Sequence, residues 1–200
     1  MTNSESDKAR TRFRTSQEYR ELEKEKDLFR RRILFIAFFS KRLGQEGVDV
    51  ILVGGEAIDL YTSGTFATSD IDLLVSDKTA AGRLLNKFGF RKEANGLWFN
   101  RQLNIVIQVI SESYSGDKTR VRKFRIKESE LAVAAPEDLI ANRLYSAKFW
   151  KSNPQRDLEQ AIALLKIFRS SIDDAYLDAL AGKHEIGDYL ADARKQASKI

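Results

Sequence analysis

The chain has 200 residues, of which 42% are hydrophobic, so it can bury a core of one or two small domains. It contains no cysteine, which excludes disulfides, thiolate zinc sites and cysteine nucleophiles. The 34 basic and 29 acidic residues leave a net charge of +5, which permits a polyanionic partner without requiring one.

Hydropathy gives no membrane span. The longest apolar run, 33–39, has seven residues, whereas a spanning helix needs about twenty. Residues 1–14 are rich in Ser and Arg and lack the apolar core of a signal peptide. We therefore expect a cytoplasmic protein without membrane contact, and the absence of cysteine suits a reducing compartment.

Apolar periodicity predicts the elements in chain order. Residues 1–15 are polar and aperiodic, so we expect a disordered N-terminus. From Ser16 apolar residues recur at three- and four-residue steps, which predicts one helix up to about residue 43. The remaining predictions are strands over 48–53, 70–75, 97–100, 104–110, 118–127 and 131–133, and helices over 56–61, 78–88, 136–150, 154–169 and onward to 200.

This order, with strands first and helices last, predicts an α+β fold with a C-terminal helical bundle. We divide the chain into the disordered segment 1–15, an α/β domain over 16–134 that includes the N-terminal helix, and a helical region over 135–200. The continuous apolar character of 48–53 predicts a central strand.

Two aspartates, Asp70 and Asp72, stand at the start of the predicted strand 70–75. Residues two apart on a strand project from the same face, about 6.6 Å apart along the backbone. Their carboxylates can therefore share one or two magnesium ions, which bind carboxylates together with phosphate oxygens. An Asp-x-Asp pair alone is also common on solvent-facing strands, so its neighbours decide its meaning.

A glycine pair, Gly54 and Gly55, stands at the predicted turn from strand to helix. Such a turn lets backbone amides approach a triphosphate and aims a helix N-terminus at the anion. Thr68 and Ser69 add hydroxyl groups directly before Asp70. In this order and spacing, the glycine turn and the aspartate pair predict a phosphate-binding site with a divalent metal.

A known family carries the same motifs. The pattern 53–55 (Val-Gly-Gly) followed by 68–73 (Thr-Ser-Asp-Ile-Asp-Leu) resembles the nucleotidyltransferase superfamily, which has the polymerase-beta-like fold. Segments 135–140 and 156–158 look like the helical region of its small bacterial and archaeal members, which include toxin components of toxin–antitoxin and phage-defence systems. The resemblance implies a mixed sheet flanked by helices.

The resemblance also implies an activity and its site. The expected reaction transfers a nucleoside monophosphate from a nucleoside triphosphate to a hydroxyl of an RNA (such as tRNA), a protein or a small molecule. Asp70 and Asp72 are the expected ligands of Mg²⁺ or Mn²⁺, and Gly54, Gly55, Thr68 and Ser69 are the expected nucleotide contacts. An antitoxin protein is a further expected partner.

The sequence departs from the family pattern at three positions. Phe66 stands where many small members have an arginine, and Gly55 stands where a serine is common. Active members take a third catalytic carboxylate from a neighbouring strand, and here that position is Gln108, whose amide cannot accept a proton. Either Glu112 or Glu56 substitutes, or the protein is a catalytically degenerate module that binds nucleotide, RNA or a partner protein.

Basic and aromatic residues outside these motifs have two interpretations each. The basic segment 118–127 is either a nucleic-acid contact or the solvated face of an edge strand, and 30–32 (Arg-Arg-Arg) is either a phosphate site or helix surface. Arg143 and Arg156 are candidates for the helical side of the cleft. Trp98 and Trp150 are expected in the core or an interface, and His184 has no expected role.

Overall fold

The computed structural model describes residues 16–110, 114, 116–150 and 152–199, so the predicted disorder of 1–15 lies outside the described residues. Its strands are β1 (Val50–Val53), β2 (Ile71–Val75), β3 (Arg91–Lys92), β4 (Trp98–Asn100), β5 (Ile105–Val109), β6 (Arg122–Ile126) and β7 (Ser129–Val133). Its helices are α2 (Gln17–Lys24), α3 (Leu28–Gly44), α4 (Gly54–Tyr61), α5 (Lys78–Lys87), α6 (Pro136–Tyr145), α7 (Pro154–Ile167), α8 (Asp174–Lys183) and α9 (Gly187–Ala197), with a 3-10 turn at Lys118–Arg120 and a π-helical turn at Ser146–Trp150.

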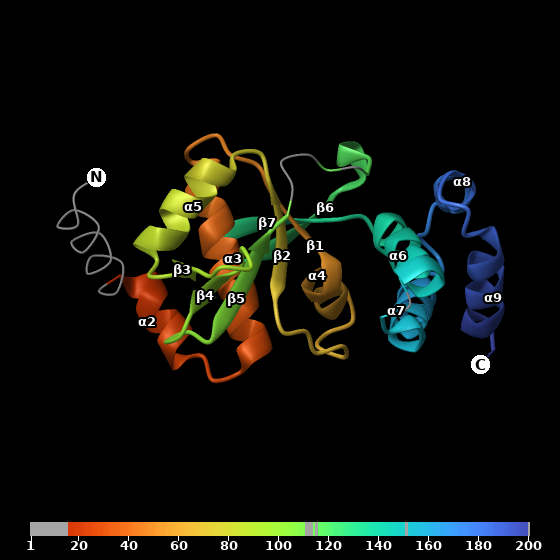
Figure 1. The fold of residues 1–200 in the computed structure, drawn as a ribbon, viewed down its shortest axis with the longest axis horizontal. Helices are drawn as coiled ribbons and strands as arrows, with labels where there is room; N and C mark the ends of the chain where they lie inside the picture. The colour runs from red at the N-terminus through yellow and green to blue at the C-terminus, as the bar shows by residue number, and fades with distance from the viewer. Residues whose placement is uncertain (1–15, 111–113, 115, 151, 200) are drawn as a thin grey trace.

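The described strands form one mixed sheet in the order β3-β4-β5-β2-β1-β7-β6. The central strand β1 runs antiparallel to β2 and parallel to β7, and β2 runs parallel to β5. The helices α6 to α9 lie together at one end of the sheet (Figure 1). The predicted α+β fold, with a mixed sheet flanked by helices and a C-terminal helical bundle, is confirmed, while the exact domain boundaries stay a prediction.

The core holds the sheet against α3 and α5. Phe35 and Phe39 of α3 are fully buried, and Phe35 packs against Phe88 and Phe90 with ring centroids 5.9 and 4.9 Å apart. Burial of such aromatic pairs is a large part of the stability of a small domain. The cluster fixes α3 on the sheet, and α3 carries an arginine that becomes important below.

Several predicted element boundaries are wrong. The single helix predicted from Ser16 to about residue 43 is two helices, because Glu25 is extended and the Asp27 side chain caps α3 by accepting from Arg30 N at 2.8 Å. The predicted outer strand over 118–127 begins only at Arg122. The helix predicted over 136–150 changes from α to π geometry at Ser146.

Strand β3 was not predicted. It consists of Arg91 and Lys92, both exposed, so no apolar alternation marks it. No helix in the described part of the chain is both long and apolar enough to cross a bilayer.

Candidate active-site cleft

The end of β1 lies opposite the start of β2. The antiparallel register places Val53 opposite Asp72, and the chain then turns directly into α4 through Gly54 and Gly55. Gly54 has φ +66°, and a Cβ added to it would lie 2.0 Å from Asp72 Oδ2. Only glycine fits here, because both the left-handed backbone and the close carboxylate exclude a side chain.

The second glycine has its own neighbour. A Cβ on Gly55 would lie 2.9 Å from Thr68 Oγ1, so the loop before β2 presses against the turn. The backbone N–H of Gly55 donates a hydrogen bond to the Asp72 carboxylate. The N-terminal end of α4 therefore faces an anionic group, as expected from the positive end of a helix.

Asp70 and Asp72 lie on the same side of β2, since Ile71 and Leu73 between and after them are fully buried. Ser69 Oγ lies 3.2 Å from Asp70 Oδ1, and Thr68 Oγ1 lies 3.5 Å from the same oxygen. Burial, together with the charge of Asp70, raises the pKa of Asp72 to about 6. A cation between the two carboxylates would relieve this repulsion.

These residues line a cleft of about 280 Å³. Gly55, Thr68, Asp70 and Asp72 form one wall. The opposite wall comes from α6, the π turn and α7, and is lined by Arg143, Ser146, Trp150, Ser152, Asn153, Arg156, Asp157 and Gln160. The structure thus brings the glycine turn, the hydroxyl-bearing loop and the aspartate pair together, as the sequence spacing predicts.

The helical wall is cationic and aromatic. Arg143 Nη1 pairs with Asp157 Oδ1 at 3.1 Å, and its charge lowers the pKa of Asp72 across the cleft against the larger effect of burial. Arg156 donates a hydrogen bond to the carbonyl of Ala67 in the opposite loop. Trp150 is 66% exposed at the π turn, so it does not lie in the core of this chain and its interface role stays a prediction, whereas Trp98 is buried.

Gln108 occupies the position where a third acid is expected. Strands β2 and β5 are parallel with Asp72 opposite Gln108, and Ile107 beside Gln108 is fully buried, so both polar side chains are on the same sheet face. Glu56 is fully buried and pairs with Arg32, so it does not reach the cleft. Glu112 lies outside the described residues.

The donor set fits a divalent metal that also binds a ligand. Among the described residues there is no group of three His, Cys, Asp or Glu side chains placed to hold an ion. Two neighbouring carboxylates remain, Asp70 and Asp72. Mg²⁺ is usually bound by one or two carboxylates plus substrate phosphates, so this pair matches that pattern.

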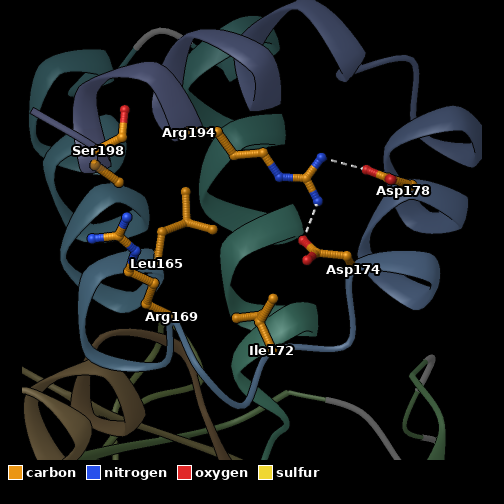
Figure 2. A pocket seen from close by; sticks show the side chains of 8 residues that line it. Leu165, Arg169, Ile172, Asp174, Asp178, Arg194 and Ser198 are labelled. Carbon is orange, nitrogen blue, oxygen red and sulfur yellow. Dashed lines mark hydrogen bonds and ion pairs between the residues drawn. The ribbon is translucent and has the colours of Figure 1, made fainter.

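A larger cavity of about 360 Å³ lies elsewhere, between α7, α8 and α9. Arg194 reaches between Asp174 and Asp178 there, at 2.6 Å from each (Figure 2). None of the predicted site residues lines it. Arg194 is already paired twice, and these ion pairs hold α9 against α8. We therefore assign the residues around this cavity a structural role.

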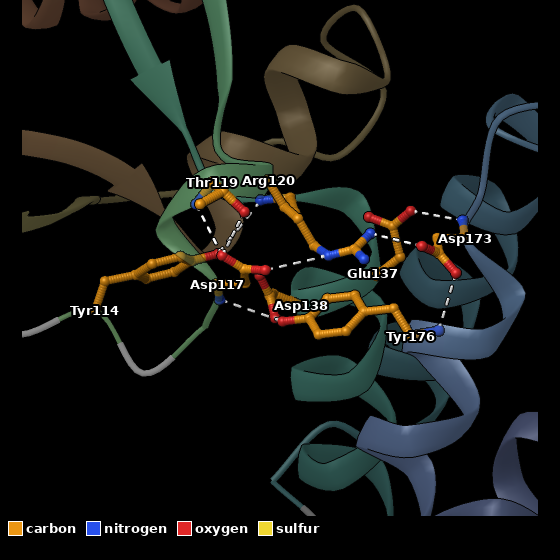
Figure 3. A network of polar contacts seen from close by, with 9 residues as sticks. Tyr114, Asp117, Thr119, Arg120, Glu137, Asp138, Asp173 and Tyr176 are labelled. Carbon is orange, nitrogen blue, oxygen red and sulfur yellow. Dashed lines mark hydrogen bonds and ion pairs between the residues drawn. The ribbon is translucent and has the colours of Figure 1, made fainter.

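A polar network joins the segment after β5 to the helical bundle (Figure 3). Asp138 of α6 accepts hydrogen bonds from Tyr114 and from Tyr176, the latter at 2.7 Å. Arg120 pairs with Asp173 at 2.7 Å. These long-range contacts fix the bundle, and with it the helical wall of the cleft, and sequence periodicity gives no signal for them.

The other basic residues are largely engaged. In the segment 118–127, Lys123 pairs with Glu130 at 2.7 Å and Lys127 pairs with Glu21. Arg31 donates to the carbonyls of Glu25 and Leu103. These contacts favour a structural role over a nucleic-acid contact for 118–127, and over a phosphate site for Arg31.

Known structures share this fold. An antigenic nucleotidyltransferase-like protein from Paracoccidioides brasiliensis aligns with a TM-score of 0.53 and 16% identity over 80% of this chain and 90% of that chain. The antibiotic-resistance factor ANT(2'')-Ia aligns with a TM-score of 0.52 and 17% identity over 82% of this chain and 94% of that chain. No protein-family profile matches the sequence, and no curated protein matches it at a significant level. The chain therefore has a nucleotidyltransferase-like fold.

Proposed function

We propose that this protein is a metal-dependent nucleotidyltransferase that binds a nucleoside triphosphate in the cleft and transfers a nucleoside monophosphate to a hydroxyl. The observation that carries this proposal is the contact between Gly54 and Asp72, where the chain leaves no room for a Cβ. A turn that excludes every side chain beside a carboxylate is expected where backbone and ligand must approach closely. The shared fold with nucleotidyltransferase-like proteins supports it.

Each wall has a part in this proposal. Gly54 and Gly55 bring backbone amides toward the triphosphate, while Thr68 and Ser69 offer hydroxyl donors. Arg143 balances phosphate charge from the helical wall, where it already faces Asp72. Trp150 offers an exposed aromatic face to the base.

Asp70 and Asp72 would hold Mg²⁺ or Mn²⁺. Such an ion supplies charge stabilisation for the phosphates and the leaving group in phosphoryl transfer. The raised pKa of Asp72, about 6, is caused first by burial, and it leaves the carboxylate ionised at neutral pH. The hydroxyl of Ser69 donates a hydrogen bond to Asp70 Oδ1, which helps to hold the Asp70 carboxylate toward the cleft.

A second candidate is nucleotide binding without transfer. Gln108 favours it, because the amide opposite Asp72 cannot take the proton of an attacking hydroxyl. In that case nucleotide stabilises the fold by mass action and no pyrophosphate is released. The acceptor in the first candidate, an RNA such as tRNA, a protein or a small molecule, and an antitoxin partner in either, are proposed from the family resemblance alone.

One experiment separates the candidates. The purified protein is incubated with Mg²⁺, nucleoside triphosphates labelled at the α-phosphate and total RNA or protein, and label transfer and pyrophosphate are measured. Transfer by the natural protein supports the first candidate. Binding without transfer, with transfer gained in Gln108→Glu, supports the second. The control is Gln45→Glu, which adds the same charge at an exposed position outside the cleft lining.

A third outcome would contradict both candidate functions. If neither the natural protein nor Gln108→Glu binds a nucleotide, measured as a shift in Tm with Mg²⁺ and each triphosphate, the proposed function is wrong.

A further inference from the structure

A buried ion-pair cluster lies behind the glycine turn, away from the cleft lining. Glu56 and Asp59 of α4 are 0% and 1% exposed, and both point toward α3. Arg32 of α3 meets them there: its Nε lies 2.8 Å from Glu56 Oε2 and its Nη2 lies 3.7 Å from Asp59 Oδ2. Residues three apart on a helix share one face, so a single guanidinium can contact both.

The cluster is short of positive charge. Neither carboxylate oxygen of Glu56 makes a hydrogen bond within the described residues, and the buried Nε of Arg32 makes none either. Their 2.8 Å contact is therefore an ion pair without hydrogen-bond geometry, and Arg32 is the counter-charge of Glu56. Burial raises the pKa of Glu56 to about 7, and the charges of Asp59 and Asp70 add to this while Arg32 opposes it. Buried carboxylates without a partner are strongly unfavourable, so the position of α4 depends on Arg32.

Each acid is linked to a segment that lines the cleft, although neither acid lines it itself. Glu56 follows Gly54 and Gly55 in the first turn of α4. Asp59 Oδ1 accepts the backbone N–H of Phe66 at 2.8 Å, within the loop 62–69 that carries Thr68 and Ser69. The bridge from α3 therefore reaches the glycine turn through one acid and the hydroxyl-bearing loop through the other.

The same loop is held from the other side. Arg156 of α7 donates to the carbonyl of Ala67, next to Phe66. The Asp59 carbonyl also accepts the N–H of Gly64 at 2.9 Å. The loop is thus fixed between α4 and the helical wall, and the α4 side of this arrangement rests on Arg32.

We propose that Arg32 is a positioning residue for the nucleotide cleft, which through Glu56 and Asp59 sets the glycine turn and the loop 62–69 at the distance that a triphosphate requires. This inference rests on the proposed nucleotide binding for its effect on affinity. Its structural part, the fixing of the loop, stands without any ligand. From the sequence, Arg32 is expected either at a phosphate site or on the helix surface, and its buried pairing with Glu56 and Asp59 fits neither.

The test compares Arg32→Lys and Arg32→Met with the control Arg30→Met. Arg30 is exposed on the same helix, and the described structure shows no side-chain partner for it. Lysine keeps the charge but is a point donor without the planar fork, so it can pair with one acid and not bridge both. Two quantities are measured: affinity for Mg²⁺ and ATP, and hydrogen exchange of the amides in 62–69 without nucleotide.

We expect Arg32→Lys to fold with nearly the Tm of the natural protein, to weaken ATP binding by about tenfold, as supporting residues of metal sites commonly do, and to speed exchange of the Phe66 amide. Arg30→Met should change neither quantity. If Arg32→Met does not fold, Arg32→Lys decides. Exchange and affinity equal to those of Arg30→Met overturn the proposal. If the natural protein binds no nucleotide, the proposed function fails and exchange alone decides the role of Arg32.

Discussion

The two walls of the cleft are built in different ways. The sheet wall presents the backbone of Gly54 and Gly55 against Asp72, and no side chain larger than hydrogen fits at the turn. The helical wall presents long side chains, Arg143 and Trp150, from helices that polar contacts hold in place. A wall made of backbone can change little in sequence, whereas a wall made of side chains can be altered to suit a base or an acceptor.

The largest effect is expected from adding a side chain at the glycine turn of the sheet wall. Gly54→Ala puts a methyl group 2.0 Å from Asp72 Oδ2 at φ +66°. We expect a loss of about 3 kcal/mol in the free energy of unfolding, from backbone strain and overpacking together, and loss of nucleotide binding. Urea unfolding measures it. Gly182→Ala, in α8 with open space around it, should be neutral or slightly stabilising; equal effects of the two would contradict the close approach.

The second largest effect is expected from removing the charge of Asp72 on the sheet wall. The pKa of Asp72 in the folded state is about 6, above its value of about 3.9 in an unfolded chain. The folded state therefore holds the proton more tightly, and this stabilisation is complete below about pH 4 and lost as the pH rises through 6. Asp72→Asn should then raise nucleotide-free stability at pH 8 by on the order of 2 kcal/mol, and by little at pH 4.

Unfolding in urea at the two pH values measures this difference. Glu56 titrates in both proteins and cancels. An advantage of the variant that is the same at pH 4 and pH 8 would show that the Asp72 carboxylate is not held at a raised pKa.

A smaller effect is expected on the helical wall. Trp150→Leu should weaken nucleotide binding about fivefold, because stacking on a base contributes on the order of 1 kcal/mol, and leave the free energy of unfolding nearly unchanged. Phe149→Leu, the neighbouring exposed aromatic outside the cleft lining, is the matched control. Nucleotide should also quench the fluorescence of Trp150 and spare buried Trp98. Quenching that survives in Trp150→Leu would place the base elsewhere.

The smallest effect tests the edge of the sheet. Lys123 pairs with Glu130 on the surface, with both side chains more than half exposed. Lys123→Ala should cost about 0.5 kcal/mol or less and leave nucleotide affinity unchanged. A strong loss of RNA binding in this variant would instead favour the basic segment as a nucleic-acid contact.

The sheet wall of the cleft is predictable from the sequence to a greater extent than the helical wall. The glycine turn and the aspartate pair follow from local order and strand spacing, which the sequence carries directly, and the position of Gln108 follows from the family resemblance. Arg32 pairing with Glu56 and the exposure of Trp150 depend on how distant elements meet, and neither leaves a periodic signal. The break at Asp27 was missed because a side-chain cap overrode continuous helical spacing.

The most direct test of the central claim is binding of Mn²⁺ with a non-hydrolysable ATP analogue, followed by the electron paramagnetic resonance of the ion. The account predicts a protein-bound Mn²⁺ signal that requires the nucleotide and is lost in the Asp70→Asn, Asp72→Asn double variant, while the variant stays folded. An unchanged bound signal in that double variant would contradict it, because the metal would then lie away from the aspartate pair.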